Sequence, residues 1–278
     1  MPPTRFPGPI CQTKDWYEDV EDGTLARMPS PDGNVLGQSP ATALAKTPAR
    51  VVASGACSFL NPVARGTVTA PKEVFERLRK NAPPAQISPT RPKASQTWPD
   101  GSTSAALEQE IQIGNQQIKV IRPTDTQASG KNLPTTAQLA EALRAVPDTQ
   151  RAYTQTVILS PMPAPDSDAT HTVGGKGGGG EIDLFPVPEA QTQTDFDNRI
   201  QHESGHNYQG HLWQSAQDVR AWQDAADADN RRPSPYAAKN AGEDFSEFII
   251  LYNAVKGTAC EATARQMYPN RWQKMAGY

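Results

Sequence analysis

The pattern of hydrophobic and polar positions becomes regular at about residue 107. In "EIQIGNQQIKVI" two alternating runs meet at Gly114 and Asn115, a dipeptide suited to the positive φ angles of a tight turn. This segment predicts a β-hairpin. Helical spacing follows in "LPTTAQLAEALRAVP", with Thr135 or Thr136 as N-cap, and the runs "AYTQTVILSP" and "EIDLFPV" then predict two strands.

The later part of the chain has helical periodicity. The segment "TDFDNRIQHESGHNYQGHLW" opens with Thr194 and Asp197 at the spacing of an N-cap and its reciprocal acidic partner. Three further helices are predicted in "SAQDVRAWQDAADADN", "KNAGEDFSEFIILYNAVKG" and "TACEATARQMYPNRW". A hairpin, a helix and two strands followed by helices indicate an α+β fold with a small mixed sheet.

Proline use separates the N-terminal part of the chain from the rest. Fifteen of the 26 prolines lie within the first hundred residues, and prolines this dense interrupt helices and ladders. One short helix is predicted at about 71–81, in "PKEVFERLRKN", with Pro71 in its first turn. We therefore expect residues 1–106 to have little other regular structure and to serve export or docking, and residues 107–278 to form the folded domain.

The glycine-rich stretch "GGKGGGG", at 174–180, lacks the features of a phosphate-binding loop. Lys176 is followed by Gly where the P-loop motif has Ser or Thr, and no helix is predicted to begin there. We expect a flexible loop before "EIDLFPV".

Charge and hydropathy narrow the range of partners. The formal net charge is −3 and the pI is about 5.8, which gives no basic face for nucleic acid and no polybasic stretch for a membrane surface. No apolar run approaches the length of about 18 residues that a membrane span needs. The first twenty residues carry Pro and charge where a classical signal peptide has its apolar stretch.

The three cysteines, Cys11, Cys57 and Cys260, are too few and too scattered for a disulfide scaffold. We expect free thiols. A bridge between Cys11 and Cys57 is the alternative if the protein acts outside a cell.

Two of the four histidines flank a glutamate in the sequence "HESGH". His202 and His206 are four residues apart, so on a helix their imidazoles project from one face and can meet one ion at about 2.0–2.1 Å, a set of donors suited to Zn²⁺. Glu203, displaced by about 100° round the helix, can take a proton from a water molecule at the ion. The motif predicts one zinc ion with Glu203 as general base.

A catalytic zinc site needs a third protein ligand. His211 is the nearest candidate, but the extended metzincin pattern would have Gly at 209 and His at 212, where Gln209 and Leu212 stand. We expect His211 to be a polar residue at the helix end or in a substrate cleft. A metzincin-like site that uses His211 remains an alternative.

The better candidate for the third ligand lies in "PYAAKNAGEDFSEF". Glu243 and Glu247 are four residues apart on a helix whose many apolar residues predict burial, and a buried carboxylate needs a cation or hydrogen-bond donors. Glu243 can therefore ligate the metal, while Glu247 supports a ligand imidazole through its distal N–H. Asp244 is expected to cap the helix or face solvent and is kept as an alternative ligand. Tyr236 can donate to the oxyanion of a tetrahedral intermediate, although core packing is the ordinary role of such a residue.

The motifs "HESGH" and "SPYAAKNAGEDFSEF" resemble those of the gluzincin zinc metallopeptidases. Within them the chain looks most like the group that includes the catalytic domain of anthrax lethal factor and the secreted Pro-Pro endopeptidases. Over residues 107–275 the resemblance implies a zincin-like fold, with His202, His206 and Glu243 as ligands and Glu203 as base. It also implies an oxyanion donor at Tyr236 and a supporting carboxylate at Glu247.

The resemblance also implies an edge strand that pairs with extended substrate, in "GGEIDLFPV". The backbone groups of this strand would bind the peptide, with nearby pockets selecting its side chains. The alternative is an internal strand without a ligand. The residues concerned are Gly180, Glu181, Ile182, Asp183 and Leu184.

These patterns together predict a zinc-dependent endopeptidase acting on a protein or peptide. The resemblance to toxin proteases implies a bacterial effector or toxin, secreted without a classical signal peptide and delivered into a target cell. Its N-terminal region would then meet a secretion apparatus or chaperone. A cytoplasmic enzyme and a catalytically inactive, zincin-fold interaction protein are the alternatives.

Overall fold

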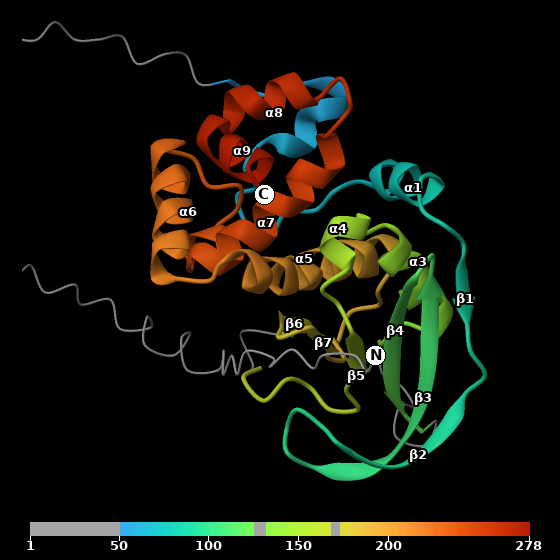
Figure 1. The fold of residues 1–278 in the computed structure, drawn as a ribbon. Helices are drawn as coiled ribbons and strands as arrows, with labels where there is room; N and C mark the ends of the chain where they lie inside the picture. The colour runs from blue at the N-terminus through green and yellow to red at the C-terminus, as the bar shows by residue number, and fades with distance from the viewer. Residues whose placement is uncertain (1–50, 125–131, 168–172) are drawn as a thin grey trace, which may run out of the picture. The chain divides into compact units, whose positions relative to one another are not determined.

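The computed structural model describes residues 51–124, 132–167 and 173–278. The stretch Val51–Tyr278 forms one compact unit. Among the described residues, seven strands form one mixed sheet in the order β1-β3-β4-β5-β7-β6, with β2 also paired to β3 (Figure 1). The strands are β1 Ala85–Ile87, β2 Arg91–Thr97, β3 Thr103–Ile113, β4 Gln116–Pro123, β5 Thr156–Leu159, β6 Gly175–Gly178 and β7 Glu181–Leu184.

The helices lie mainly on one side of the sheet (Figure 1). Their bounds are α1 Lys72–Lys80, α3 Thr136–Arg144, α4 Asp148–Arg151, α5 Gln193–Leu212, α6 Ala216–Ala228, α7 Ala241–Val255, α8 Glu261–Met267 and α9 Pro269–Ala276. Two short 3-10 helices, η2 Gly55–Leu60 and η3 Tyr236–Ala238, complete the described helical elements. The predicted combination of a mixed sheet with helices is confirmed.

The predicted hairpin is confirmed as β3 and β4, which pair antiparallel from Ile113 opposite Gln116. Gly114 has φ of 59° in the turn, the left-handed region that glycine enters without a steric cost. The helix α3 is also confirmed. Thr135 is its N-cap and exchanges hydrogen bonds with Gln138 in a capping box.

The glycine-rich stretch forms a strand, so the prediction of a flexible loop is wrong for Gly175–Gly178. This strand, β6, pairs antiparallel with β7 and ends the sheet. β7 in turn pairs in parallel with β5 on its other side. The expected edge strand, Gly180 and Glu181–Leu184, is therefore internal, because the later order of strands cannot be read from an apolar run.

The motif helix α5 begins two residues earlier than predicted. Its N-cap is Thr192, which forms a capping box with Asp195. Asp197, expected in that role with Thr194, is buried and accepts a hydrogen bond from Arg79 instead. Thr192 with Asp195 and Thr194 with Asp197 have the same spacing in the sequence. The burial of Asp197 against Arg79 is what leaves the capping role to Thr192 and Asp195.

The other helical predictions are confirmed with one exception. The final predicted helix divides into α8 and α9 at Tyr268, whose φ of −136° is not helical. Pro269 then begins α9, where the missing proline N–H costs nothing.

The expected domain boundary at residue 106 has no counterpart in the structure. The predicted short helix is present as α1, but β1 and β2 also lie in this Pro-rich part and pair with β3. Pro92 is in β2, which pairs only with β3 among the described strands, and proline is tolerated on such edge strands. Leu60 and Phe75 are fully buried in the core. Within residues 51–106, a high density of prolines therefore does not mean a lack of regular structure. Residues 1–50 lie outside the described ranges.

A disulfide joins Cys57 in η2 to Cys260, the residue before α8. The expectation of free thiols is therefore wrong for this pair, and the alternative partner, Cys11, lies outside the described residues. The two cysteines are 203 positions apart, so nothing local in the sequence could connect them.

The helix α5 lies between the sheet and the group formed by α6 to α9 (Figure 1). One apolar core, including Ile118, Leu143 and Ile200, fills the space between the sheet, α3 and α5. A second, including Phe75, Phe248 and Trp272, joins the N-terminal segment to the C-terminal helices. The motif helix is thereby held on both sides.

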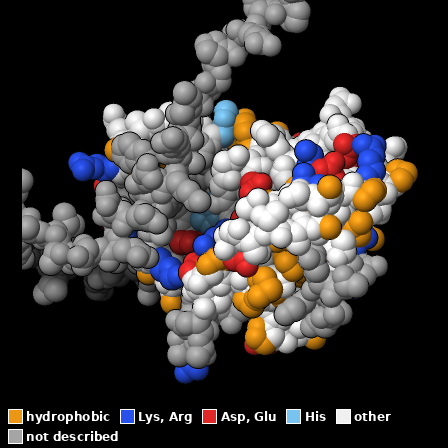
Figure 2. All heavy atoms as spheres, turned by 90° about the horizontal axis from the view of Figure 1, so that it is seen from below, with side chains coloured by type: hydrophobic (Ala, Val, Ile, Leu, Met, Phe, Trp, Pro, Cys, Tyr) orange, Lys and Arg blue, Asp and Glu red, His pale blue; other side chains and the backbone are white. Residues whose placement is uncertain are grey.

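Among the described residues, no helix has the length and apolar character needed to cross a membrane. On the face shown in Figure 2, described acidic and basic side chains lie intermixed around small hydrophobic groups.

Candidate metal centre

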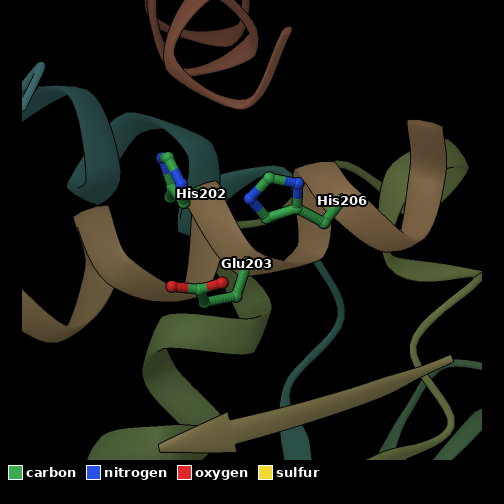
Figure 3. A group of neighbouring side chains, drawn as sticks. All are labelled: His202, Glu203 and His206. Atoms are coloured by element: carbon green, nitrogen blue, oxygen red, sulfur yellow. The ribbon is translucent and has the colours of Figure 1, made fainter. Parts of the chain in front are cut away.

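The two histidines of "HESGH" lie one turn apart on α5 and project from the same side of the helix, with Glu203 on a neighbouring side (Figure 3). Possible ligand atoms of His202, Glu203 and His206 all lie within 4.8 Å of one another. The helical spacing therefore produces the cluster that the motif predicts.

The third predicted ligand comes from α7, which packs across α5. Oε2 of Glu243 lies 3.0 Å from Nε2 of His202 and 3.3 Å from Nε2 of His206. Bonds of about 2.0–2.1 Å in a tetrahedral zinc site place neighbouring donor atoms about 3.3 Å apart. Two imidazole nitrogens and one carboxylate oxygen at these separations fit a zinc ion.

Close packing of α5 on α7 brings the three donors together. A Cβ on Gly205 would lie 3.1 Å from side-chain atoms of Ile249 and Ser246. A larger residue at position 205 would therefore press the two helices apart. Asn240 caps α7 by accepting the N–H of Glu243 at 2.9 Å, which fixes the start of the helix that carries this ligand.

Glu247 is fully buried behind the cluster and uses both oxygens. Its Oε1 lies 3.0 Å from Nδ1 of His202, and its Oε2 accepts the Val68 N–H at 2.5 Å and the Ser234 hydroxyl at 2.7 Å. A carboxylate in this position fixes the tautomer and orientation of a ligand imidazole. The structure places Glu247 where a supporting residue is expected.

The protonation of His202 reflects these two carboxylates. Burial alone lowers the pKa of its imidazole, but the hydrogen bonds to Glu243 and Glu247 outweigh that effect and raise the pKa to about 10. Burial likewise acts to raise the pKa of Glu243, yet hydrogen bonds from His202 and His206 hold it well below its usual range. Without a metal, the carboxylate and the imidazolium stabilise each other.

Glu203 lies at the boundary between the cluster and the sheet. Burial raises the pKa of its carboxyl, an effect that the positive charge of the histidines partly opposes. A Cβ on Gly175 would lie 2.6 Å from Oε1 of Glu203, and one on Gly177 would lie 2.1 Å from its backbone oxygen. Gly175 and Gly177 are therefore required because β6 lies directly against the motif helix at these two positions.

Tyr236, in η3, lines the same cavity as His202 and has its ring centroid 5.8 Å from the His202 ring. Burial, followed by the nearby charge of Glu243, raises the pKa of its phenol well above the usual range. The phenol therefore stays protonated and able to donate a hydrogen bond.

Polar side chains on α5 hold the helix in place. Asn207 accepts the Gly180 N–H at 2.9 Å and donates to the Glu181 carbonyl at 3.2 Å, which ties α5 to the turn before β7. Asn198 accepts the Ala70 N–H at 2.7 Å and donates to the Ala70 carbonyl at 3.1 Å. The Asn207 pair sets the position of the motif helix against the sheet, and the buried Asn198 pair joins the helix to the N-terminal segment.

A cavity of about 480 Å³ opens beside the cluster. His202, Glu203, Tyr236 and Glu247 line one part of it. The remaining lining includes Gly66–Thr69 of the N-terminal segment, Gly174 before β6, Gly175 at its start, and Arg199 on α5. Sequence reasoning missed Val68 and its neighbours, because no motif links them to the histidines. Arg199 was missed too, although its position one turn before "HESGH" on the same helix could have indicated that it lies near the site.

Two other candidate residues lie apart from the cluster. His211 is exposed at the end of α5, where its ring stacks on Tyr153 with centroids 3.9 Å apart. Asp244 is fully buried, so the expectation that it caps the helix or faces solvent is wrong. Its carboxylate accepts hydrogen bonds from Nε and Nη2 of Arg271, each at 2.7 Å, and from the indole N–H of Trp222 at 2.9 Å. These contacts give Asp244 a structural role.

The strand expected to bind peptide is not at the edge of the sheet. The backbone of Glu181–Leu184 is paired on both sides and is not available to an added strand. β6 takes the edge position next to Glu203.

Comparison of the chain with known protein families, with curated proteins and with solved structures finds no match. The assignment of the candidate metal centre therefore rests on the geometry of its residues alone. That geometry consists of two imidazoles, one carboxylate in contact with both, and a second carboxylate behind them.

Proposed function

We propose that this protein is a zinc-dependent endopeptidase with a zincin-like catalytic unit. The observation that carries the proposal is the position of Glu243 Oε2 within 3.0 and 3.3 Å of the two imidazole nitrogens. His202, His206 and Glu243 would hold one zinc ion. When bound, the ion supplies Lewis acidity, which polarises the scissile carbonyl and makes water a stronger acid.

The chain's own residues then have separate tasks. Glu203 takes a proton from the attacking water and returns it to the leaving nitrogen, a role that its raised pKa favours. The protonated phenol of Tyr236 donates to the oxyanion that develops on the carbonyl oxygen. Glu247 keeps the His202 ring oriented.

Substrate would enter as an extended peptide along β6. That strand ends the sheet, and its glycines place the backbone against Glu203. A strand edge offers N–H and C=O groups to a peptide backbone without regard to side chains. The task expected of residues 180–184 thus falls to Gly175–Gly178.

The first test of the proposal is metal content together with cleavage. Protein purified without chelator is expected to contain about one zinc ion per chain by inductively coupled plasma mass spectrometry. Wild type and Glu203→Gln are then incubated with a cell lysate, and new peptide N-termini are identified by labelling and mass spectrometry. Termini formed only by wild type support the proposal.

The same experiment also tests the alternative that the protein is a catalytically inactive interaction protein. A zinc-containing wild type whose termini equal those of Glu203→Gln would indicate an interaction protein without catalysis. A metzincin-like site is assessed by the ligand variants. His211→Ala should retain zinc and Glu243→Ala should lose it, and the reverse result would refute the proposed ligand set.

We further propose that the enzyme is an exported bacterial effector or toxin. The disulfide between Cys57 and Cys260 supports a period spent in an oxidising compartment, because such bonds are uncommon in reducing cytosol. Fusing residues 1–50 to a reporter tests export separately from the folded unit, which begins at Val51. A fusion that stays in the producing cells would remove the support for an export role of this segment.

A further inference from the structure

Arg199 lies on α5 one turn before the histidine pair and lines the cavity that His202 and Glu203 also line. Its side chain is partly buried under Gly174. A Cβ at Gly174 would lie 2.8 Å from Cζ of Arg199, so the glycine leaves space for the guanidinium. The cation is therefore built into the wall of the candidate site.

The hydrogen bonding of this guanidinium is incomplete. Nη2 donates to Oε1 of Gln191 at 2.7 Å, whereas Nη1 is buried and has no hydrogen-bond partner in the described part of the chain. A buried charged donor without an acceptor is costly, and in a native structure it indicates a bound water, ion or ligand group. The cavity beside Arg199 is where such a group could approach.

Several other buried or partly buried arginines are paired with carboxylates. Arg271 contacts Asp229 and Asp244, with hydrogen bonds of 2.7–3.0 Å. Arg199, in contrast, has no ion pair within 4.0 Å among residues 51–124, 132–167 and 173–278. The other buried or partly buried arginines with a carboxylate partner are Arg79, Arg144, Arg151 and Arg232.

The acidic groups near Arg199 are already committed to other contacts. Asp195 accepts the Thr192 N–H and hydroxyl, both at 2.7 Å, as part of the helix cap. Glu203 interacts with Arg199 only at longer range, and burial lowers the pKa of the Arg199 guanidinium despite that carboxylate. The exposed Glu189, at the rim of the cavity, remains solvated. Nη1 itself has almost no solvent-accessible surface, so a ligand carboxylate in the cavity would meet this unfilled donor once the guanidinium turns toward it.

We propose that Arg199 determines specificity by binding a carboxylate of the peptide substrate, close to the scissile bond. This inference rests on the proposed endopeptidase function. A guanidinium binds a carboxylate with two parallel N–H donors, which gives orientation as well as attraction. The carboxylate comes from an Asp or Glu side chain or from the peptide C-terminus.

The cleavage test uses the full-length, zinc-loaded protein and a library of N-acetylated, C-amidated peptides. Wild type is expected to favour Asp or Glu at one position near the cut over Asn or Gln by about tenfold or more. Arg199→Gln should abolish this preference, and Arg199→Lys should restore part of it. Arg220→Gln, an equal charge change at an exposed residue of α6, is the matched control and should keep the preference.

A pair of Asn-containing peptides, one with a free C-terminus and one amidated, separates the two sources of the carboxylate. Preference for the free form that depends on Arg199 assigns the chain terminus. Cleavage by wild type that favours neither an acidic side chain nor a free C-terminus, or that favours Lys or Arg, overturns the proposal while leaving the endopeptidase function intact.

A binding test decides the role of Arg199 without turnover. Zinc-loaded Glu203→Gln is titrated with an Asp peptide and with its Asn counterpart, and then with the corresponding free-acid and amide peptides. The carboxylate forms should bind about tenfold more tightly. Adding Arg199→Gln should remove the difference. Equal binding of carboxylate and neutral forms by Glu203→Gln overturns the proposal, whatever the cleavage test shows.

Discussion

The backbone N–H of Val68 donates to Oε2 of Glu247 at 2.5 Å, across 179 positions of sequence. The other oxygen of the same carboxylate contacts Nδ1 of His202. A segment expected to serve export or docking thus holds a residue that orients the candidate ligand.

Glu247→Gln should weaken zinc binding without unfolding the protein, because the amide keeps the shape but loses the charge that supports His202. We expect the zinc dissociation constant to rise by about 10–100-fold, measured by competition with a chelator of known affinity. Glu76→Gln, at an exposed carboxylate on α1, is the control and should bind zinc as wild type does. Equal affinities in the two variants would contradict the supporting role of Glu247.

Glu243→Ala should reduce the zinc content of the purified protein from about one ion per chain to a small fraction of that. The change removes one of three donors, and two imidazoles alone hold zinc poorly. His211→Ala, on the same helix as the histidine pair but outside the cluster, should keep a full complement. Metal analysis after dialysis provides the measurement.

Zinc binding should depend on pH because His202 must lose a proton. Its folded-state pKa, about 10, exceeds the ordinary value of 6.5, so the imidazolium's hydrogen bonds stabilise the metal-free fold below pH 6.5 and cease to do so as the pH rises through 10. Zinc requires the neutral ring.

We therefore expect the apparent zinc affinity to increase by about tenfold per pH unit between pH 7 and 9. Calorimetry in two buffers of different ionisation enthalpy should report release of about one proton per zinc ion. An affinity independent of pH over this range would show that the ring is already neutral.

Gly177→Ala should destabilise the protein, because the added Cβ would lie 2.1 Å from the backbone oxygen of Glu203. Backbone cannot move aside as a flexible side chain can, so β6 must shift from α5, at a cost of about 1–3 kcal/mol in the free energy of unfolding. Gly178→Ala is the matched control, since a Cβ there meets nothing within 4 Å. Urea denaturation of both variants tests the contact, and equal midpoints would refute it.

Loss of the disulfide should lower the free energy of unfolding by about 2–5 kcal/mol. Cys57→Ser, Cys260→Ser and the double variant should show equal losses, because each removes the same bond. Thermal unfolding of wild type with and without a thiol reductant gives an independent comparison. A transition unaffected by reductant would mean that the bond does not contribute.

Sequence signals that act over a few residues identified much of the structure. The positive φ of Gly114 and the capping box of Thr135 are local events, and the spacing of His202 and His206 follows from helix geometry alone. Glu243 could be recognised because a carboxylate on an apolar helix must have a partner. These features required no knowledge of how distant segments meet.

The features that sequence reasoning missed arise from contacts between distant segments. Gly175–Gly178 was taken for a loop because glycine-rich segments act as flexible chain, yet contact with α5 excludes larger side chains at Gly175 and Gly177. The pairing of β7 on both sides depends on the order of the whole sheet. Cys57 and Val68 likewise meet partners that only the folded chain brings within reach.

The hydrogen bond from Val68 to Glu247 also bears on the timing of maturation. Residue 68 is synthesised 179 positions before residue 247, so the hydrogen bond behind His202 cannot form while α7 is still being translated. A nascent chain stopped between residues 211 and 240 carries both imidazoles but neither carboxylate. A metal ion could therefore meet all three proposed ligands only after α7 has been synthesised.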